Sequence, residues 1–175
     1  MTSADDQARV DGSGDDASGV GASDRSRDEQ QQEARSYALR LLGRREYSLA
    51  ELVARLEGKG YARPLAQQVG RQLQEDGYQS DSRFVEVFGR SRIARGVGPM
   101  LLRAELRGRG IDDELIDEAV THPQSFWIDV AAQAVNRRFR GSARTRDDWA
   151  QQARYLARKG HSADLIYSVL GSQPG

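Results

Sequence analysis

The sequence predicts an all-α protein, built as an elongated, curved stack of three tandem three-helix repeats. The chain matches itself without gaps when it is shifted by fifty residues, which is typical of a repeat architecture. Apolar residues recur at helical spacing, and no stretch alternates apolar and polar residues in the period of a β-strand. Because one unit of about 45 residues buries too little surface to be stable alone, neighbouring units are expected to share interfaces.

The three shifted segments agree at positions that serve helix structure. They align Leu56, Leu106 and Leu156; Lys59-Gly60, Arg109-Gly110 and Lys159-Gly160; Leu65, Leu115 and Leu165; and Val69, Ala119 and Val169. Each basic residue followed by glycine predicts a helix end, since glycine readily adopts positive φ and a cation suits the negative end of the helix dipole. A second helix is expected to begin within a few residues of each glycine.

The expected helix starts carry chemical signatures of their own. Ser48 with Glu51 predicts a capping box, and Thr145 with Asp148 repeats the same spacing. Pro99 predicts the first turn of another helix, where its missing N–H has no intrahelical partner to lose. These signals agree with the repeat boundaries although they are independent of the repeat.

A further amphipathic helix is expected before each helix pair. These helices carry Tyr37, Ala38, Leu41 and Leu42, then Phe84, Val87, Phe88 and Ser91, then Phe126, Trp127, Val130, Ala131, Ala134 and Val135. We expect Phe126 and Trp127 to pack in the core rather than to stack on nucleic-acid bases. The predicted organisation is a disordered acidic tail over residues 1–28, followed by three-helix repeats over residues 29–78, 79–121 and 122–175.

Composition limits the classes of protein that remain. Only 38% of the residues are hydrophobic and 30% are charged, which is too lean for one large core and fits several small ones. Cysteine is absent and only His122 and His161 offer imidazole, so disulfides are excluded and neither a zinc site nor a cofactor is expected. Without a signal-peptide pattern or a run of about 18 apolar residues, a cytoplasmic protein that does not enter the membrane is expected.

The formal net charge of zero hides two parts of opposite sign. Residues 1–34 hold three basic and nine acidic residues, a net charge of −6, whereas residues 35–175 hold 23 basic and 17 acidic residues, a net charge of +6. A basic folded part favours a polyanionic partner such as nucleic acid or a nucleoprotein, because bound cations release condensed counterions. The alternative is a basic surface that serves solubility alone.

Ten arginines are the candidate contacts for such a partner. They are Arg90, Arg92, Arg95, Arg103, Arg107, Arg137, Arg138, Arg140, Arg144 and Arg146. Guanidinium groups suit carboxylates and phosphates because they bind both in a bidentate manner. The five arginines within residues 137–146 repel one another and are expected to need a partner or salt. The alternative is a solvated helix face, and at the next helix start Asp81 and Arg83 are expected instead to cap the helix and to form an ion pair.

Four motifs of the middle repeat resemble the RecX family in order and spacing. They are Asp81-Ser82-Arg83-Phe84, Arg90-Ser91-Arg92, Gly96-Val97-Gly98-Pro99, and Glu105-Leu106 followed by Arg109-Gly110-Ile111. The resemblance covers residues 34–172. It departs from the family at Gly89, where a larger residue is common, and at His161, which replaces an apolar or aromatic residue.

The resemblance implies a monomeric modulator of the RecA recombinase that has no enzymatic activity. Such a protein would lie in the helical groove of the RecA filament on single-stranded DNA and would inhibit ATP hydrolysis, strand exchange and co-protease activity. It would thereby regulate DNA repair and the SOS response, and it would bind DNA weakly by itself. The ten arginines are then candidates for contacts with RecA or with DNA.

Two other function classes are weighed against this expectation. In a helix-turn-helix DNA-binding regulator, the third helix of a repeat would enter the major groove, but residues 112–118 carry five acids that phosphates would repel. The corresponding helix of the first repeat, with Gln67, Gln68 and Arg71, is the only one suited to reading bases. An enzyme is disfavoured, because the sequence has no Walker loop, no His-Glu-x-x-His and no Gly-x-Ser-x-Gly motif.

Overall fold

The computed structural model describes residues 18–139 and 141–174, with side chains from residue 26 onward. This part of the chain folds into nine α-helices and contains no strand. The helices are α1 (Ser18–Leu42), α2 (Leu49–Gly58), α3 (Arg63–Glu75), α4 (Asp81–Ala94), α5 (Pro99–Arg107), α6 (Asp113–Val120), α7 (Gln124–Arg138), α8 (Arg146–Arg158) and α9 (Ala163–Leu170). The predicted all-α class is confirmed.

Helix α1 begins earlier than expected. Residues 18–28, which the sequence places in the acidic tail, are part of this helix, and residues 1–17 of that tail lie outside the described part. Residues 24–33 are rich in arginine, glutamine and glutamate, which are good helix formers, and extending a helix needs no new nucleus. The helix has no apolar period there because residues 26–30 are exposed and pack on nothing.

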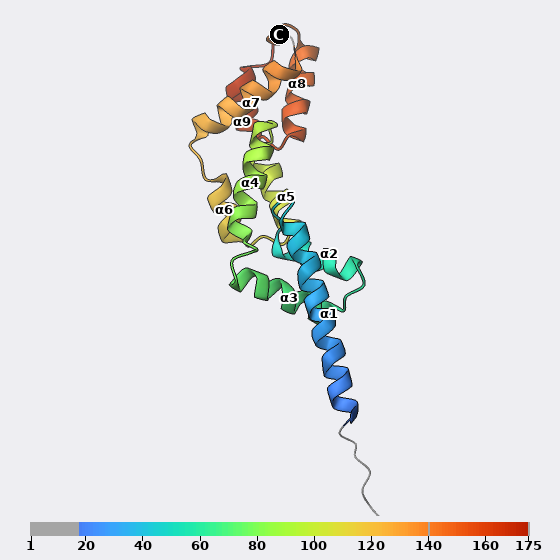
Figure 1. The fold of residues 1–175 in the computed structure, drawn as a ribbon. Coiled ribbons are helices and arrows are strands. Elements are labelled where there is room, and N and C mark those ends of the chain that lie inside the picture. Colours follow the sequence, from blue (N-terminus) through green and yellow to red (C-terminus); the bar gives the residue numbers. More distant parts are fainter. Residues whose placement is uncertain (1–17, 140, 175) are drawn as a thin grey trace, which may run out of the picture.

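The helices form three trios in series. Figure 1 shows α1 to α3, α4 to α6 and α7 to α9 following one another along the long axis, with the N-terminal half of α1 projecting beyond the first trio. The helices of each trio pack mainly on one another. The predicted stack of three-helix repeats is therefore confirmed.

Each repeat has a small apolar core. Leu52, Leu56 and Leu73 lie at the centre of the first core, and Leu102 and Leu106 at the centre of the second. The second core continues into the third repeat, where it includes Trp127, Val130 and Leu165. A third cluster consists of Ala131, Ala134, Val135, Leu156 and Ile166. The cores thus follow one another instead of merging into one globular centre, as the lean composition predicted.

The helix ends match the glycine pattern. Gly60, Gly110 and Gly160 have φ of 105°, 73° and 87°, a region that favours glycine, so the three predicted turns are confirmed. Thr145 and Asp148 form the predicted capping box.

Two predicted caps differ in the structure. Ser48 accepts from the Glu51 amide at 3.1 Å, but the Glu51 carboxylate lies 3.4 Å from both Arg45 and Arg109, so ion pairing replaces half of the predicted capping box. Ser80, not Asp81, caps α4.

Asp81 forms a hydrogen bond between the first and second repeats. Its Oδ1 accepts from the Leu49 amide at 2.8 Å and from Gln79 Nε2 at 2.7 Å, and this contact with the preceding repeat replaces the capping role. Arg83 forms an ion pair with Glu46 at 3.2 Å, as predicted.

The first junction joins the start of α2 to the turn between α5 and α6. Ser48 Oγ donates to the carbonyl oxygen of Arg109 at 2.8 Å. A Cβ on Gly110 would lie 2.6 Å from the Ala50 Cβ, so the turn can approach α2 this closely only with glycine.

The second junction repeats this arrangement fifty residues later. The Gly98 amide donates to the carbonyl oxygen of Lys159 at 2.7 Å, and the Met100 amide donates to that of Gly160 at 3.1 Å. A Cβ on Gly160 would lie 2.4 Å from Leu101. The N-cap residue of one repeat therefore binds the basic turn of the next at both junctions.

Candidate basic interaction surface

The predicted arginines of α4 and α5 are mostly ion-paired. Arg90 lies 2.8 Å from Glu86 one turn earlier, and Arg107 lies 2.6 Å from Asp113 of α6. Arg103 pairs in the same way with Asp117 of α6. These pairs are exposed and contribute little stability, but each offsets a charge that would otherwise be open to a partner.

Arg92 and Arg95 differ from that group. Arg92 is half-buried and makes a bidentate pair with Glu105, which joins α4 to α5 and makes Arg92 a structural residue. The Arg95 side chain is exposed at the end of α4 and has no acidic partner among the described residues. Of the candidates in the second repeat, Arg95 alone is free to bind an anion without breaking a described ion pair.

The third repeat carries the excess positive charge. Residues 122–175 hold eight basic and four acidic residues, a net charge of +4, whereas residues 79–121 hold seven basic and eight acidic residues, a net charge of −1. No basic side chain of the third repeat forms an ion pair in the part of the chain that the structure describes. Residues 29–78 hold eight basic and seven acidic residues, a net charge of +1, so the third repeat carries the largest net positive charge of the three.

Three arginines of the predicted cluster are exposed around the loop between α7 and α8. Arg138 lies with its guanidinium carbon 5.5 Å from the Phe139 ring centre, and the side chains of Arg144 and Arg146 form no hydrogen bond or ion pair in the described part of the chain. Arg140 lies outside the described residues. Arg138, Arg144 and Arg146 therefore flank this loop as exposed candidates without a described ion pair.

Asp148 lies beside this cluster but is engaged in helix capping. The hydrogen bond from the Thr145 side chain, followed by those from the Thr145 and Arg144 amides, lowers the pKa of the Asp148 carboxyl below its usual value. Its oxygens accept from the backbone of the loop rather than from arginine side chains. The ionised carboxylate stabilises the loop, and the Arg144 charge attracts it more weakly than these hydrogen bonds do.

Arg137 has a structural role that the sequence did not reveal. Its Nη1 donates to the carbonyl oxygen of Ala94 at 2.9 Å, and Lys159 Nζ donates to that of Arg95 at 3.1 Å. These carbonyl groups form the C-terminal end of α4, where cations are favoured by the helix dipole. Arg137 therefore fixes the third repeat to the second.

His161 is the other residue of this junction. It is 3% exposed, and its Nε2 lies 3.1 Å from the carbonyl oxygen of Gly96. Burial and the nearby Lys159 charge lower the pKa of His161, although the Gly96 carbonyl opposes the shift, so the neutral ring donates from Nε2. Its Nδ1 is buried without a partner among the described residues. A shift of fifty residues aligns His161 with Ile111, which is buried. This alignment was the sequence signal that could have predicted the burial of His161.

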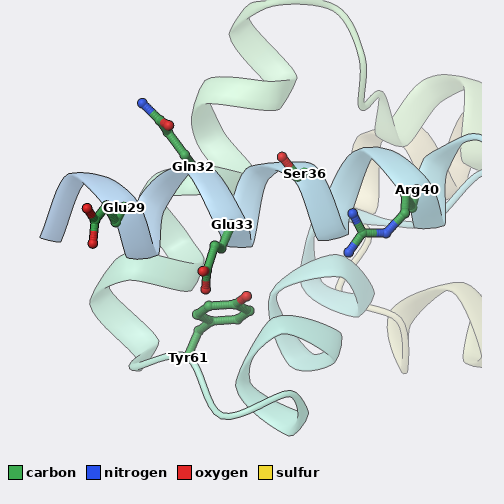
Figure 2. A pocket seen from close by; sticks show the side chains of 6 residues that line it. All are labelled: Glu29, Gln32, Glu33, Ser36, Arg40 and Tyr61. Carbon is green, nitrogen blue, oxygen red and sulfur yellow. The ribbon is translucent and has the colours of Figure 1, made fainter. Parts of the chain in front are cut away.

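An acidic hollow on the first repeat was not expected from the sequence. Figure 2 shows its lining, which consists of Glu29, Gln32, Glu33, Ser36 and Arg40 of α1 and Tyr61, which lies between α2 and α3. Glu33 points toward Tyr61, and neither Glu29 nor Glu33 has an ion pair within the described residues. The i, i+4 spacing of the two glutamates was the available signal, since it places both on one helix face.

Other kinds of site are not found in the described part. No group of three or more histidine and acidic side chains there could hold a metal ion. Nor does any described helix combine the length and the apolar character that crossing a membrane requires.

Models of three consecutive domains match this chain. The first three-helix domain of RecX matches residues 34–73, the second matches residues 80–120 and the third matches residues 128–170. The chain belongs to the RecX family. Each matched domain falls on one helix trio of the structure, which agrees with the resemblance found in the middle repeat.

RecX proteins of known sequence support the assignment. The chain is 40% identical over 132 residues to the Regulatory protein RecX of Chromohalobacter salexigens, which covers 75% of this chain and 87% of that protein. It is 39% identical over 137 residues to the Regulatory protein RecX of Legionella pneumophila, which covers 75% of this chain and 89% of the other.

Solved RecX structures share the fold. The crystal structure of RecX from Lactobacillus salivarius aligns with a TM-score of 0.67 at 18% identity, over 81% of this chain and 94% of that one. A second structure, described as regulatory protein RecX, aligns with a TM-score of 0.72 at 22% identity, over 93% of this chain and 80% of that one. At these identities the likeness concerns the fold alone.

Proposed function

We propose that this RecX-family chain is a negative modulator of the RecA recombinase. It binds in the groove of the RecA filament on single-stranded DNA and inhibits ATP hydrolysis, strand exchange and co-protease activity. Through these effects it regulates DNA repair and the SOS response in the cytoplasm. It acts by binding and has no turnover of its own.

The observation that carries this proposal is that some of the candidate arginines form ion pairs with acidic side chains and others do not. Arg90, Arg103 and Arg107 form ion pairs, whereas Arg138, Arg144 and Arg146 form none among the described residues. Exposed cations without partners gain most from an anionic surface, because they lose no ion pair and release counterions from the polyanion. We therefore assign the contact with the filament to the loop between α7 and α8.

The serial fold supports the same proposal. A filament groove is long, and a stack of trios presents a long surface of fixed shape in which each repeat contacts only its neighbours. Because the excess charge lies at one end, we expect the third repeat to provide electrostatic attraction and the other two to provide shape. Weak direct binding to single-stranded DNA would then also depend on the third repeat.

The test compares two triple variants that remove the same number of arginines. One changes Arg138, Arg144 and Arg146 to alanine, and the matched control changes Arg90, Arg103 and Arg107 to alanine. The measurement is DNA-dependent ATP hydrolysis by the cognate RecA with increasing amounts of each protein. We expect the wild type and the control to inhibit and the third-repeat variant to need at least about ten times more protein, which corresponds to about 1.4 kcal/mol.

Each outcome separates two parts of the proposal. Hydrolysis that is unaffected by excess wild-type protein would contradict the inhibitory function. Equal potency of the two triple variants would leave the function standing and would contradict the assignment to the third repeat.

The helix-turn-helix alternative is disfavoured by the pairing of α6. Asp113 and Asp117 of α6 form ion pairs with Arg107 and Arg103 of α5. The surface of α6 is therefore acidic, and the arginines that pair with it belong to the neighbouring helix. A footprint on a defined duplex site in the absence of RecA would nevertheless favour that alternative.

A further inference from the structure

Each end of the repeat stack has one of the two elements that form a junction, but not its partner. At the two internal junctions an N-cap residue, Ser48 or Gly98, donates to a carbonyl oxygen in the next basic turn, at 2.8 Å for Arg109 and 2.7 Å for Lys159. The third repeat also has an N-cap residue, Thr145, but no basic turn lies against it in the described part of the chain. The first repeat has a basic turn that no N-cap residue contacts.

Thr145 holds the same N-cap position in α8 that Ser48 holds in α2, but its hydrogen bonds stay within its own helix. Ser48 Oγ accepts from an amide of its own helix at 3.1 Å while its hydroxyl proton goes to Arg109. Thr145 Oγ1 accepts from the Asp148 amide at 3.1 Å, and the Thr145 side chain also hydrogen-bonds the Asp148 carboxyl. Thr145 therefore has a hydroxyl that could cross a junction, but in this structure it is used locally.

A hollow adjoins this N-cap. It is lined by Phe139, Gly141, Ser142, Arg144, Asp148, Gln151 and Gln152. Gln152 is 4% exposed, and its Oε1 has no hydrogen-bond partner among the described residues. Gln152 Oε1 is therefore a buried acceptor that is available to a donor entering this hollow.

The unused turn of the first repeat has the geometry of the two that are docked. Gly60 has φ of 105°, and a Cβ on it would meet nothing within 4 Å, whereas a Cβ on Gly110 or Gly160 would overlap the preceding repeat. Lys59 is exposed, and no described group donates to its carbonyl oxygen. The turn is therefore preformed and unoccupied.

The two free ends also have opposite charge. Glu29 and Glu33 line the hollow beside Tyr61, which directly follows the unused turn (Figure 2). Arg144 and Arg146 flank the Thr145 N-cap at the other end of the stack. A surface formed by these two ends would bring unpaired carboxylates to unpaired guanidinium groups.

We propose that a second copy of this chain continues the stack head to tail. The Lys59-Gly60 turn of one copy would lie on the start of α8 in the other, where the Thr145 hydroxyl would exchange its bond to the Asp148 carboxyl for one to the Lys59 carbonyl oxygen. Such a contact is heterologous, so its repetition builds a linear chain of copies. The copies are monomeric when dilute and associate at high concentration and low salt. This inference does not depend on RecA binding.

The absence of cysteine allows a direct cross-linking test. The full-length chain receives Lys59→Cys and Ser142→Cys together, and a short bis-maleimide linker is added to concentrated protein at low salt. We expect a ladder of covalent dimers, trimers and longer chains. The matched control combines Lys59→Cys with Ser82→Cys, an exposed position in α4 far from either end, and is expected to remain mostly monomeric.

Two further variants test the geometry and the charge of the joint. Gly60→Ala should abolish the ladder, because a Cβ there would overlap α8 of the neighbour as it would at Gly110 and Gly160. Glu29→Lys with Glu33→Lys should weaken the ladder without touching the turn. Circular dichroism confirms that each variant is folded.

Three results would overturn the proposal. The first is equal cross-linking of the test and control pairs. The second is a cross-link formed only within single chains, which would indicate that the two ends meet intramolecularly. The third is a ladder that persists in folded Gly60→Ala, since the contact would then not resemble the internal junctions.

Discussion

Arg137 of the third repeat donates to the carbonyl oxygen of Ala94, 43 residues earlier, at 2.9 Å. Together with Lys159 and His161, it supplies donors to three successive carbonyl groups at the C-terminal end of α4. The junction between the second and third repeats is therefore held by polar side chains in addition to the apolar core that continues into Trp127, Val130 and Leu165. Several of its properties can be tested in solution.

The first prediction concerns Arg137 itself. Arg137→Ala removes a charge-assisted bond across the junction and should lower the free energy of unfolding by about 1 kcal/mol, because the side chain is exposed. The loss should appear as faster hydrogen exchange in α7 and α9. Arg154→Ala, which removes an exposed arginine without a described partner, is the control and should change neither quantity.

The second prediction concerns pH. Burial lowers the pKa of His161 in the folded state below its ordinary value of about 6.5, so the unfolded chain binds a proton first as the pH falls. The contribution of His161 to stability is fully present above pH 6.5. It should decrease as the pH falls from about 6.5 toward the folded-state pKa.

Urea unfolding at several pH values measures this effect. His161→Phe places an aromatic residue where the family resemblance has one and should flatten the pH dependence between about 5 and 7. An identical pH profile in the variant would show that another group is responsible.

The third prediction compares two glycines with the same turn geometry. Gly60→Ala should cost about 1–2 kcal/mol, which reflects positive φ alone, because no atom lies within 4 Å of the added Cβ. Gly160→Ala should cost more than about 3 kcal/mol, because its Cβ would lie 2.4 Å from the Leu101 amide nitrogen. Chemical denaturation of both variants measures the difference, and equal losses would argue against close packing at the second junction.

The fourth prediction concerns Gln152. It occupies the repeat position of Leu52 and Leu102, which are fully buried, and its Oε1 is buried without a described partner. Gln152→Leu should raise the free energy of unfolding by about 1 kcal/mol, because the unpaired acceptor is removed. Gln151→Leu, at an exposed neighbouring position, should have no such effect.

The repeat made most of the fold predictable. The alignment of Gly60, Gly110 and Gly160 located three helix ends, and the same shift placed the equivalent leucines in three cores. The start of α1 was missed because its solvated turns have no apolar period, although their residues favour helix.

The candidate site was less predictable because ion pairing depends on which helices face one another. Arg103 and Arg107 looked free in the sequence, yet α6 brings Asp117 and Asp113 to them. Arg137 looked like part of a charge cluster, yet it binds Ala94 across the junction. Spacing along one helix identifies a shared face, but it does not reveal the partner on another helix.

Salt dependence of filament binding tests the central claim most directly. The dissociation constant for the RecA filament on single-stranded DNA is measured from about 50 to 200 mM salt for the wild type and both triple arginine variants. Arg138, Arg144 and Arg146 changed to alanine should weaken binding and flatten the salt dependence, whereas Arg90, Arg103 and Arg107 changed to alanine should match the wild type. Wild-type slopes in both variants would contradict the role assigned to the unpaired arginines of the third repeat.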